Sequence, residues 1–239
     1  MPVSYYREVV FGLRAEPYVA VQDPRRHGQR VVMRSPWGWT DAIGSWSWPG
    51  FEGRPVVVEV YADADEVELV LGGQSVCRVP VGERLPFLAE PEIAWAPGEL
   101  VAIAYRDGAE VGRTSVRSAD GPLELRATAD RASIRADDRD LAYVALERCD
   151  ADGVLDPSAE WQIEVEVTGA GALVGYASAD PASDERFDGT RRTTYLGRAL
   201  AVLRPTGPGT ITLTARATGP GAPDAATVVE VAASDTASP

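Results

Sequence analysis

The stretch from Ser45 to Val76, SWSWPGFEGRPVVVEVYADADEVELVLGGQSV, joins a pair of tryptophans to two runs of alternating apolar and polar residues. In the second run, Val67, Leu69 and Leu71 share one face and glutamates take the other, as a half-buried β-strand requires. Two glycines follow and predict a turn. No nucleophile motif, metal-ligand motif or phosphate-binding loop lies in this stretch, so it predicts architecture rather than chemistry.

The same period of two recurs further along the chain. The apolar faces are Trp161, Ile163, Val165 and Val167 in one run and Ile211, Leu213 and Ala215 in another. Turn signals separate the runs at Asp107-Gly108, Asp152-Gly153 and Gly207-Pro208-Gly209. Short strands divided in this way are typical of antiparallel sandwiches. The sequence therefore predicts an all-β protein with two consecutive immunoglobulin-like β-sandwich domains.

A domain boundary is predicted near residue 120, because one strand series ends at Val116 and another begins at Leu123. A chain of 239 residues is long enough for two cores of ordinary size. We assign residues 37–119 to the first sandwich, 121–233 to the second and 234–239 to a disordered tail. Residues 1–36 then form a linker that contains the one helix-like segment, Ser4 to Gly12, with a serine cap and a glycine stop.

The charge of the chain excludes two classes of partner. Its 36 acidic and 23 basic residues give a net charge of -13, which repels nucleic acids and anionic membranes. No apolar run approaches the roughly 20 residues of a membrane span, and the first residues do not form an export signal, which favours the cytoplasm. Cys77 and Cys149 fall in different predicted domains, so we expect free thiols.

Three motifs that could carry chemistry have simpler interpretations. His27, the only histidine, lies in the polar segment DPRRHGQR, and we expect a solvated side chain rather than a functional one. In DADGVLD the glycine comes fourth, not sixth as in a calcium loop, which favours a hairpin turn. In GAGALVG, from Gly169 to Gly175, no helix pattern follows, which favours a strand connection over a dinucleotide site. We expect no metal and no cofactor.

Two groups of residues remain as candidates for a carbohydrate contact or a contact between domains. They are the tryptophans Trp37, Trp39, Trp46 and Trp48, and the acidic residues Asp180, Asp184, Glu185 and Asp188. Tryptophans at a spacing of two could stack on sugars, or fill a core or a domain seam. The carboxylates could be solvated, or could contact a neighbouring domain, a sugar or a cation. Catalysis would need two of them about 5 to 9 Å apart across a sugar.

The opening stretch resembles the segment that follows the catalytic barrel in glycoside hydrolase family 2 β-galactosidases. That segment reads His-Trp-x-Trp, then a strand, then Asn-Ala-Asp-Glu-Val-Glu-Leu. Trp46, Trp48 and the run from Ala64 to Leu69 fall on this pattern, whereas Ser45 and Asp63 depart from it.

A second stretch, from Asp137 to Gly219, is similar to the fifth domain of that family. It contains DLAYV, a hairpin with DADG, an Asp-Pro loop in which Ala179 stands in place of the usual glycine, and the strand GTITL. The resemblance covers most of residues 37–218, and the segment before it resembles the end of the barrel and the link out of it. No stretch matches the barrel strands that carry the catalytic glutamates.

The resemblance implies a non-catalytic C-terminal piece of a retaining β-galactosidase, with no catalytic residue of its own. Its partner would be the catalytic barrel, which the sandwiches would support and whose substrate rim they could extend, and another copy of the chain could add an oligomer contact. The alternative is a carbohydrate-binding module that grips a β-linked oligosaccharide. Adhesion-type domains without any link to sugars fit the strand pattern but not the order of the motifs.

Overall fold

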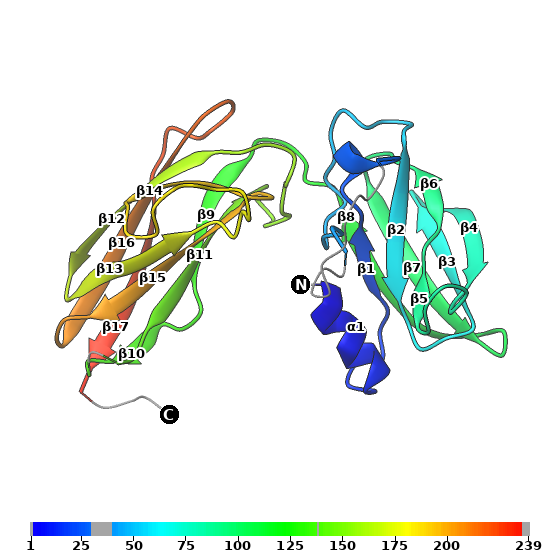
Figure 1. Ribbon diagram of the computed structural model, residues 1–239, viewed down its shortest axis with the longest axis horizontal. Helices are drawn as coiled ribbons and strands as arrows, with labels where there is room; N and C mark the ends of the chain where they lie inside the picture. The colour runs from blue at the N-terminus through cyan, green and yellow to red at the C-terminus, as the bar shows by residue number, and fades with distance from the viewer. Residues whose placement is uncertain (1, 30–39, 138, 236–239) are drawn as a thin grey trace. The chain divides into compact units, whose positions relative to one another are not determined.

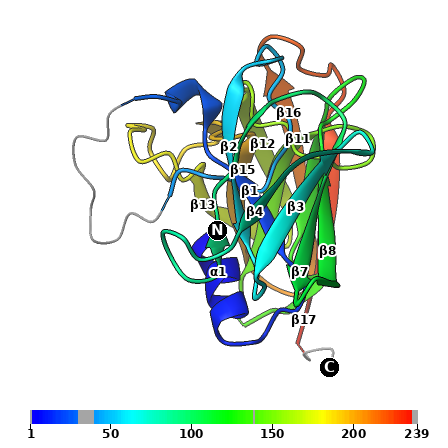
Figure 2. The same ribbon diagram turned by 90° about the vertical axis from the view of Figure 1, so that its right-hand side faces the viewer.

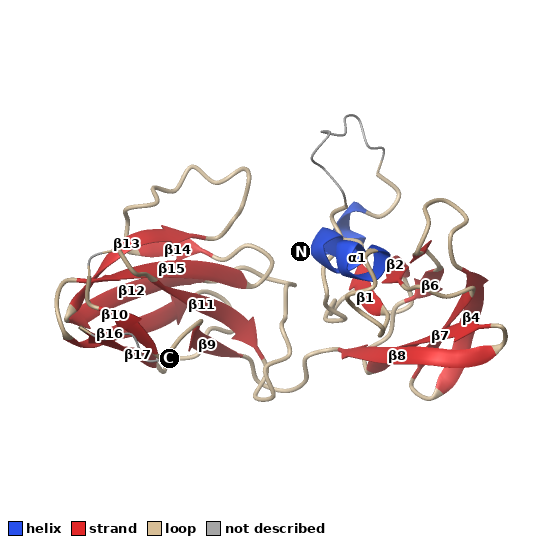
Figure 3. Ribbon diagram, turned by 90° about the horizontal axis from the view of Figure 1, so that it is seen from below, coloured by secondary structure: helices blue, strands red, loops and turns tan. Residues whose placement is uncertain are grey.

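The computed structural model describes residues 2–29, 40–137 and 139–235. The chain divides into two compact units, Met1–Ser118 and Ala119–Pro239. Strands dominate both units (Figure 1). In the described part of the chain the helical elements are α1 (Pro2–Val10) and the short 3-10 turn η1 (Pro24–Arg26), drawn in blue in Figure 3. The predicted all-β class is confirmed.

The first unit is a sandwich of two antiparallel sheets. Its strands are β1 (Tyr18–Val21), β2 (Pro55–Tyr61), β3 (Glu66–Leu71), β4 (Gln74–Pro80), β5 (Leu88–Ala89), β6 (Glu92–Ala94), β7 (Glu99–Arg106) and β8 (Ala109–Arg117). One sheet has the order β1-β2-β5 with β6 also paired to β2, and the other has the order β4-β3-β7-β8 (Figure 2). Val58 and Val60 of the first sheet and Leu69 and Leu100 of the second have no exposed surface and belong to one core cluster.

The second unit is also a sandwich. Its strands are β9 (Glu124–Ala129), β10 (Ser133–Arg135), β11 (Ala142–Cys149), β12 (Gln162–Gly169), β13 (Gly171–Ala177), β14 (Arg191–Thr193), β15 (Arg198–Pro205), β16 (Gly209–Thr218) and β17 (Thr227–Ser234). The sheets have the orders β10-β17-β16-β12-β14 and β13-β15-β11-β9. The pairing of β10 with β17 is parallel, and the other pairings are antiparallel.

Burial follows the predicted alternation. Val67 and Leu69 of β3, Ile163 of β12, and Ile211 and Leu213 of β16 all have no exposed surface. Cys77 and Cys149 are free, in separate units.

The N-terminal helix begins two residues before the predicted serine cap. Pro2 occupies its first turn, where a missing N–H costs no hydrogen bond, and the chain leaves the helix at Gly12 with φ +65°. The segment 1–36, which is predicted to be a linker, belongs to the first unit. β1 pairs with β2 across the register Tyr18↔Tyr61, so this part of the segment is a strand of the sandwich.

The turn between β14 and β15, which belong to different sheets, provides a test of the second sandwich. Gly197 has φ +75°, and a Cβ added there would lie 2.5 Å from the carbonyl oxygen of Asp156. Gly121 has a similar φ of +72° with no atom within 4 Å of an added Cβ. We expect Gly121→Ala to lower the free energy of unfolding by about 1 kcal/mol, and Gly197→Ala by about 3 kcal/mol or more. Urea unfolding measures both, and equal losses would refute the steric role of Asp156.

Candidate functional site

Trp46 and Trp48 lie inside the first sandwich. Trp46 is 0% exposed and Trp48 is 1% exposed. The Trp46 Nε1 donates to the carbonyl oxygen of Ala96 at 2.9 Å, and the Trp95 Nε1 donates to the Trp46 carbonyl at 3.2 Å. Neither buried ring can stack on a sugar, so the sugar-platform hypothesis is wrong for these two residues. Trp37 and Trp39 lie outside the described residues.

The predicted acidic residues lie on the loop 178–190, which joins β13 to β14. Asp180 is half-buried, and its Oδ1 accepts a hydrogen bond from the Ala182 amide at 2.9 Å. Asp184 is exposed. The Asp188 carboxylate receives two hydrogen bonds from Arg186, at 2.9 and 2.6 Å, and both side chains are mostly solvated. These three carboxylates are therefore surface groups.

Glu185 differs from its neighbours because it turns inward. Its Oε1 accepts hydrogen bonds from the amide and the hydroxyl of Thr193, at 3.1 and 2.9 Å. Its Oε2 lies 3.3 Å from the Arg192 Nη1. Burial raises the pKa of Glu185, but the Thr193 donors and the Arg192 charge lower it by more, so the pKa lies below its ordinary value. This carboxylate is an ionised structural anchor, which does not suit a general acid.

Arg192 is the centre of this arrangement, and no motif in the sequence indicates its role. Its side chain is 2% exposed, and its Nη2 donates to the carbonyl oxygens of Tyr176 and Arg186, at 2.7 and 2.5 Å. The guanidinium carbon also lies 5.5 Å from the centroid of the Phe187 ring. One buried cation thus ties the end of β13 to the far side of the loop, and the Phe187 side chain remains 71% exposed.

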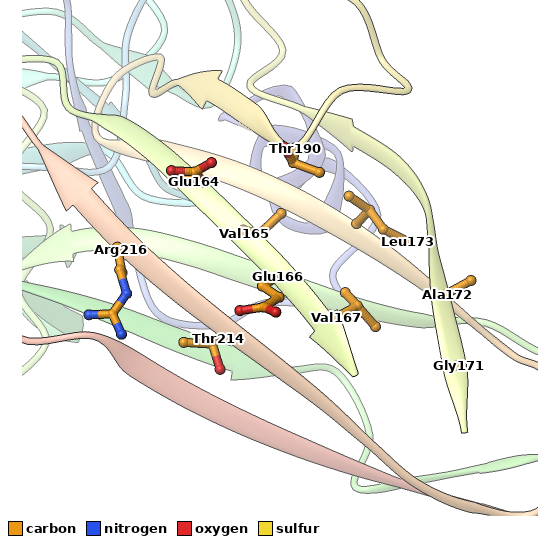
Figure 4. A pocket seen from close by; sticks show the side chains of 10 residues that line it. All are labelled: Glu164, Val165, Glu166, Val167, Gly171, Ala172, Leu173, Thr190, Thr214 and Arg216. Atoms are coloured by element: carbon orange, nitrogen blue, oxygen red, sulfur yellow. The ribbon is translucent and has the colours of Figure 1, made fainter. Parts of the chain in front are cut away.

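A cavity of about 620 Å³ opens beside β12 (Figure 4). Its lining consists of Glu164, Val165, Glu166, Val167, Gly171, Ala172, Leu173, Thr190, Thr214 and Arg216. Both glutamates are exposed on the outer face of the strand, and Glu164 pairs with Arg191 at 3.2 Å. The valines lie on the side of β13 (Figure 4). Both carboxylates project from the exposed face of one strand and Glu164 is paired with Arg191, so they are not an acid and a nucleophile on opposite sides of a bound sugar, as glycoside hydrolysis requires.

The remaining motifs have structural roles. Asp150 is buried, and its carboxylate accepts hydrogen bonds from the amides of Asp120, Asp152 and Val154, as in a hairpin turn. His27 is exposed, with its Nε2 3.6 Å from a carboxylate oxygen of Glu92. Across residues 2–29, 40–137 and 139–235, no group of three or more His, Cys, Asp or Glu side chains is placed to hold a metal ion. No helix in those ranges is long and apolar enough to span a membrane.

Comparisons with known proteins find a matching family model for each unit and a relative that aligns with both. A family model described as glycoside hydrolase family 2 C-terminal domain 5 matches residues 125–225. A model of a domain of unknown function (DUF4982) matches residues 53–112. The chain is 33% identical over 224 residues to the beta-galactosidase BoGH2A of Bacteroides ovatus, an alignment that covers 90% of this chain and 24% of that protein.

The solved structures agree with the sequence comparisons. A glycosyl hydrolase family 2 member from Bacteroides cellulosilyticus matches with a TM-score of 0.80 and 30% identity, over 97% of this chain and 30% of that one. A beta-glucuronidase from glycoside hydrolase family 2 shares the fold, with a TM-score of 0.70 and 20% identity, over 95% of this chain and 21% of that one. The chain thus spans about a quarter of the length of the relatives it matches.

The anchoring role of Arg192 can be tested against its neighbour in the sequence. Arg192→Met leaves two carbonyls and Glu185 without their buried partner, and we expect a loss of about 3 kcal/mol in the free energy of unfolding. Arg191→Met removes an exposed pair with Glu164 and should change it by less than about 1 kcal/mol. Thermal and urea unfolding of both variants measure the difference, and similar losses would contradict an anchoring role.

Proposed function

Because the chain has the sequence and fold of the C-terminal domains of glycoside hydrolase family 2 enzymes, we propose that it is the non-catalytic accessory region of a longer glycosidase. In this proposal its two sandwiches support a catalytic domain that supplies the reaction. That domain hydrolyses terminal β-galactosides with retention, using two carboxylates of its own. The name of the Bacteroides ovatus relative supports the choice of galactosides.

The observation that carries this proposal is that the candidate carboxylates are already bound by other groups of the protein. Glu185 binds Thr193 and Arg192, Asp150 binds backbone amides, and Glu164 pairs with Arg191 on an open sheet face. A retaining glycosidase needs one carboxyl with a raised pKa beside one ionised carboxylate, about 5 Å apart in a cleft. Although burial raises the pKa of Glu185, the Thr193 donors and the Arg192 charge hold it below its ordinary value, which does not suit the acid of such a pair.

A direct assay tests the proposal. Residues 1–239 alone should not hydrolyse chromogenic β-galactosides or β-glucuronides, whereas the longer enzyme should hydrolyse the galactoside. The longer enzyme with both catalytic glutamates replaced by glutamine controls for contaminating activity. The accessory assignment would be overturned if hydrolysis co-purifies with residues 1–239 and is lost at the temperature at which they unfold.

One observation favours carbohydrate binding as a second function. The Phe187 ring is 71% exposed on a loop that the buried Arg192 holds in place, and a fixed aromatic ring binds at a low entropic cost. A sugar could rest its apolar face on this ring, while the exposed carboxylate of Asp184 accepts hydrogen bonds from its hydroxyl groups. This function would use the acidic loop and none of the buried tryptophans.

Calorimetry with galactose, lactose and β-linked oligosaccharides tests this second function. If the loop binds sugars, Phe187→Ala should weaken binding about tenfold, because a contacting ring contributes on the order of 1.4 kcal/mol. Phe11→Ala is the matched control, since Phe11 is 72% exposed in the other unit, close to the 71% of Phe187. No saturable binding by the folded chain, or equal losses in the two variants, would exclude a sugar site at Phe187.

A further inference from the structure

The C-terminal end of α1 presents three large apolar side chains to solvent within four residues. Val10 is 37% exposed, Phe11 is 72% exposed and Leu13 is 77% exposed. We name these three residues the α1 apolar end. Single apolar residues on a surface need no explanation, but a contiguous group marks a surface that binds something. The other exposed large apolar residues of the described chain come singly along the sequence.

The α1 apolar end is held in a defined conformation by the closing turn of the helix. The Gly12 amide donates to the Val9 carbonyl at 3.0 Å, and the Leu13 amide donates to the Glu8 carbonyl at 2.7 Å. With Gly12 at φ +65°, this is a Schellman motif. In such motifs the residue at the position of Leu13 frequently makes an apolar contact with the last turn of the helix, but that turn offers Arg7 and Glu8 here, and Leu13 is mostly exposed. Its apolar partner is therefore missing from this chain's own helix.

The helix itself is fixed to the first sandwich through its other side chains. Tyr5 stacks on Tyr18 with ring centroids 3.8 Å apart, and Tyr6 packs edge-on against Tyr61 at 5.6 Å. Val9 is 3% exposed beneath the helix. The α1 apolar end therefore cannot bury itself by rotating the helix without breaking these contacts.

The Arg14 side chain adds a further restraint just after the apolar end. Its Nε donates to a carboxylate oxygen of Glu8 at 2.9 Å, and its guanidinium lies 5.0 Å from the Tyr5 ring centroid. Contacts of the protein therefore restrain the chain on both sides of Leu13: the hydrogen bonds of the closing turn before it and the side chain of Arg14 after it. A rigid apolar group in solvent loses little conformational entropy when a partner covers it.

The position of α1 in the sequence favours one occupant, a polypeptide that precedes the helix. The relatives are three to four times longer than the part that this chain matches, since it covers 24% of one and 30% of another. The helix begins at Pro2, so any polypeptide joined before residue 1 enters the structure at this helix. Covalent attachment gives that polypeptide a high effective concentration at the α1 apolar end, higher than free molecules reach.

We propose that Val10, Phe11 and Leu13 are buried against the catalytic region that precedes this chain in a longer enzyme. This inference rests on the proposed function, in which the sandwiches support a catalytic domain, and it names the surface through which they contact that domain. One side of α1 then belongs to the sandwich core and its C-terminal end belongs to the interface. The helix transmits the fixed position of the sandwich to the catalytic region.

Hydroxyl-radical footprinting of residues 1–239 and of the longer enzyme tests the contact directly. We expect Phe11 and Leu13 to be oxidised at least about fivefold more slowly in the longer enzyme, as a buried side chain should be. Val228, at 56% exposure in the second unit, serves as the internal reference. Equal oxidation of Phe11 in the two proteins would overturn the proposal.

Paired substitutions test whether the contact supports the catalytic region. Phe11→Ser with Leu13→Ser should shift the melting temperature of residues 1–239 by less than about 2 °C, because both side chains are exposed there. In the longer enzyme the same pair should make thermal inactivation at least about threefold faster. Val76→Ser with Val228→Ser, at exposed strand positions, should leave the inactivation rate unchanged.

The outcomes separate this inference from the proposed function. If the longer enzyme hydrolyses the galactoside while Phe11 stays exposed, the interface is wrong and the accessory function stands. If residues 1–239 hydrolyse it alone, the accessory function is wrong. If residues 1–239 form a dimer that Phe11→Ser with Leu13→Ser dissociates, and the longer enzyme forms the same dimer, the occupant is a second copy and the proposal fails.

Discussion

The structure depends on the burial of every second residue between two facing sheets. In the first unit Val58 and Val60 of one sheet meet Leu69 and Leu100 of the other in a single core cluster, and none has exposed surface. The hydrophobic effect makes this the dominant stabilising interaction of a sandwich. It also commits half of each strand to the core. Side chains that bind a partner must therefore come from outer faces, loops or the N-terminal helix.

This constraint explains which features could be predicted from the sequence. The alternation of Val67 with Leu69, and of Ile211 with Leu213, identifies a strand and its buried face without any knowledge of the partner sheet. The tryptophans could not be assigned in this way. A spacing of two places Trp46 and Trp48 on one side of an extended chain, but the core or the solvent can lie on that side. For Trp46, contact with Trp95, almost fifty residues away, decides it.

The anchoring of the acidic loop could not be predicted for a related reason. The sequence shows the carboxylates of residues 180–188 close together, which suggests one shared role. The structure separates Glu185 from the rest because Arg192 and Thr193, on the next strand, are brought beneath it. The arginine also binds backbone carbonyls, and no pattern of side chains in the sequence reports such partners. Long-range polar contacts are thus the part of this site that requires coordinates.

Phe11 and Phe187, the most exposed large apolar aromatic rings of the described chain, share one physical arrangement. Near each ring in the sequence an arginine restrains the chain: Arg14 pairs with the Glu8 carboxylate and lies over the Tyr5 ring, and Arg192 donates to two backbone carbonyls. Every basic residue of the chain is an arginine. A planar guanidinium can donate several hydrogen bonds and contact a ring at once, which an ammonium group cannot. Polar anchoring therefore holds both rings in place in solvent, where a partner can bury them.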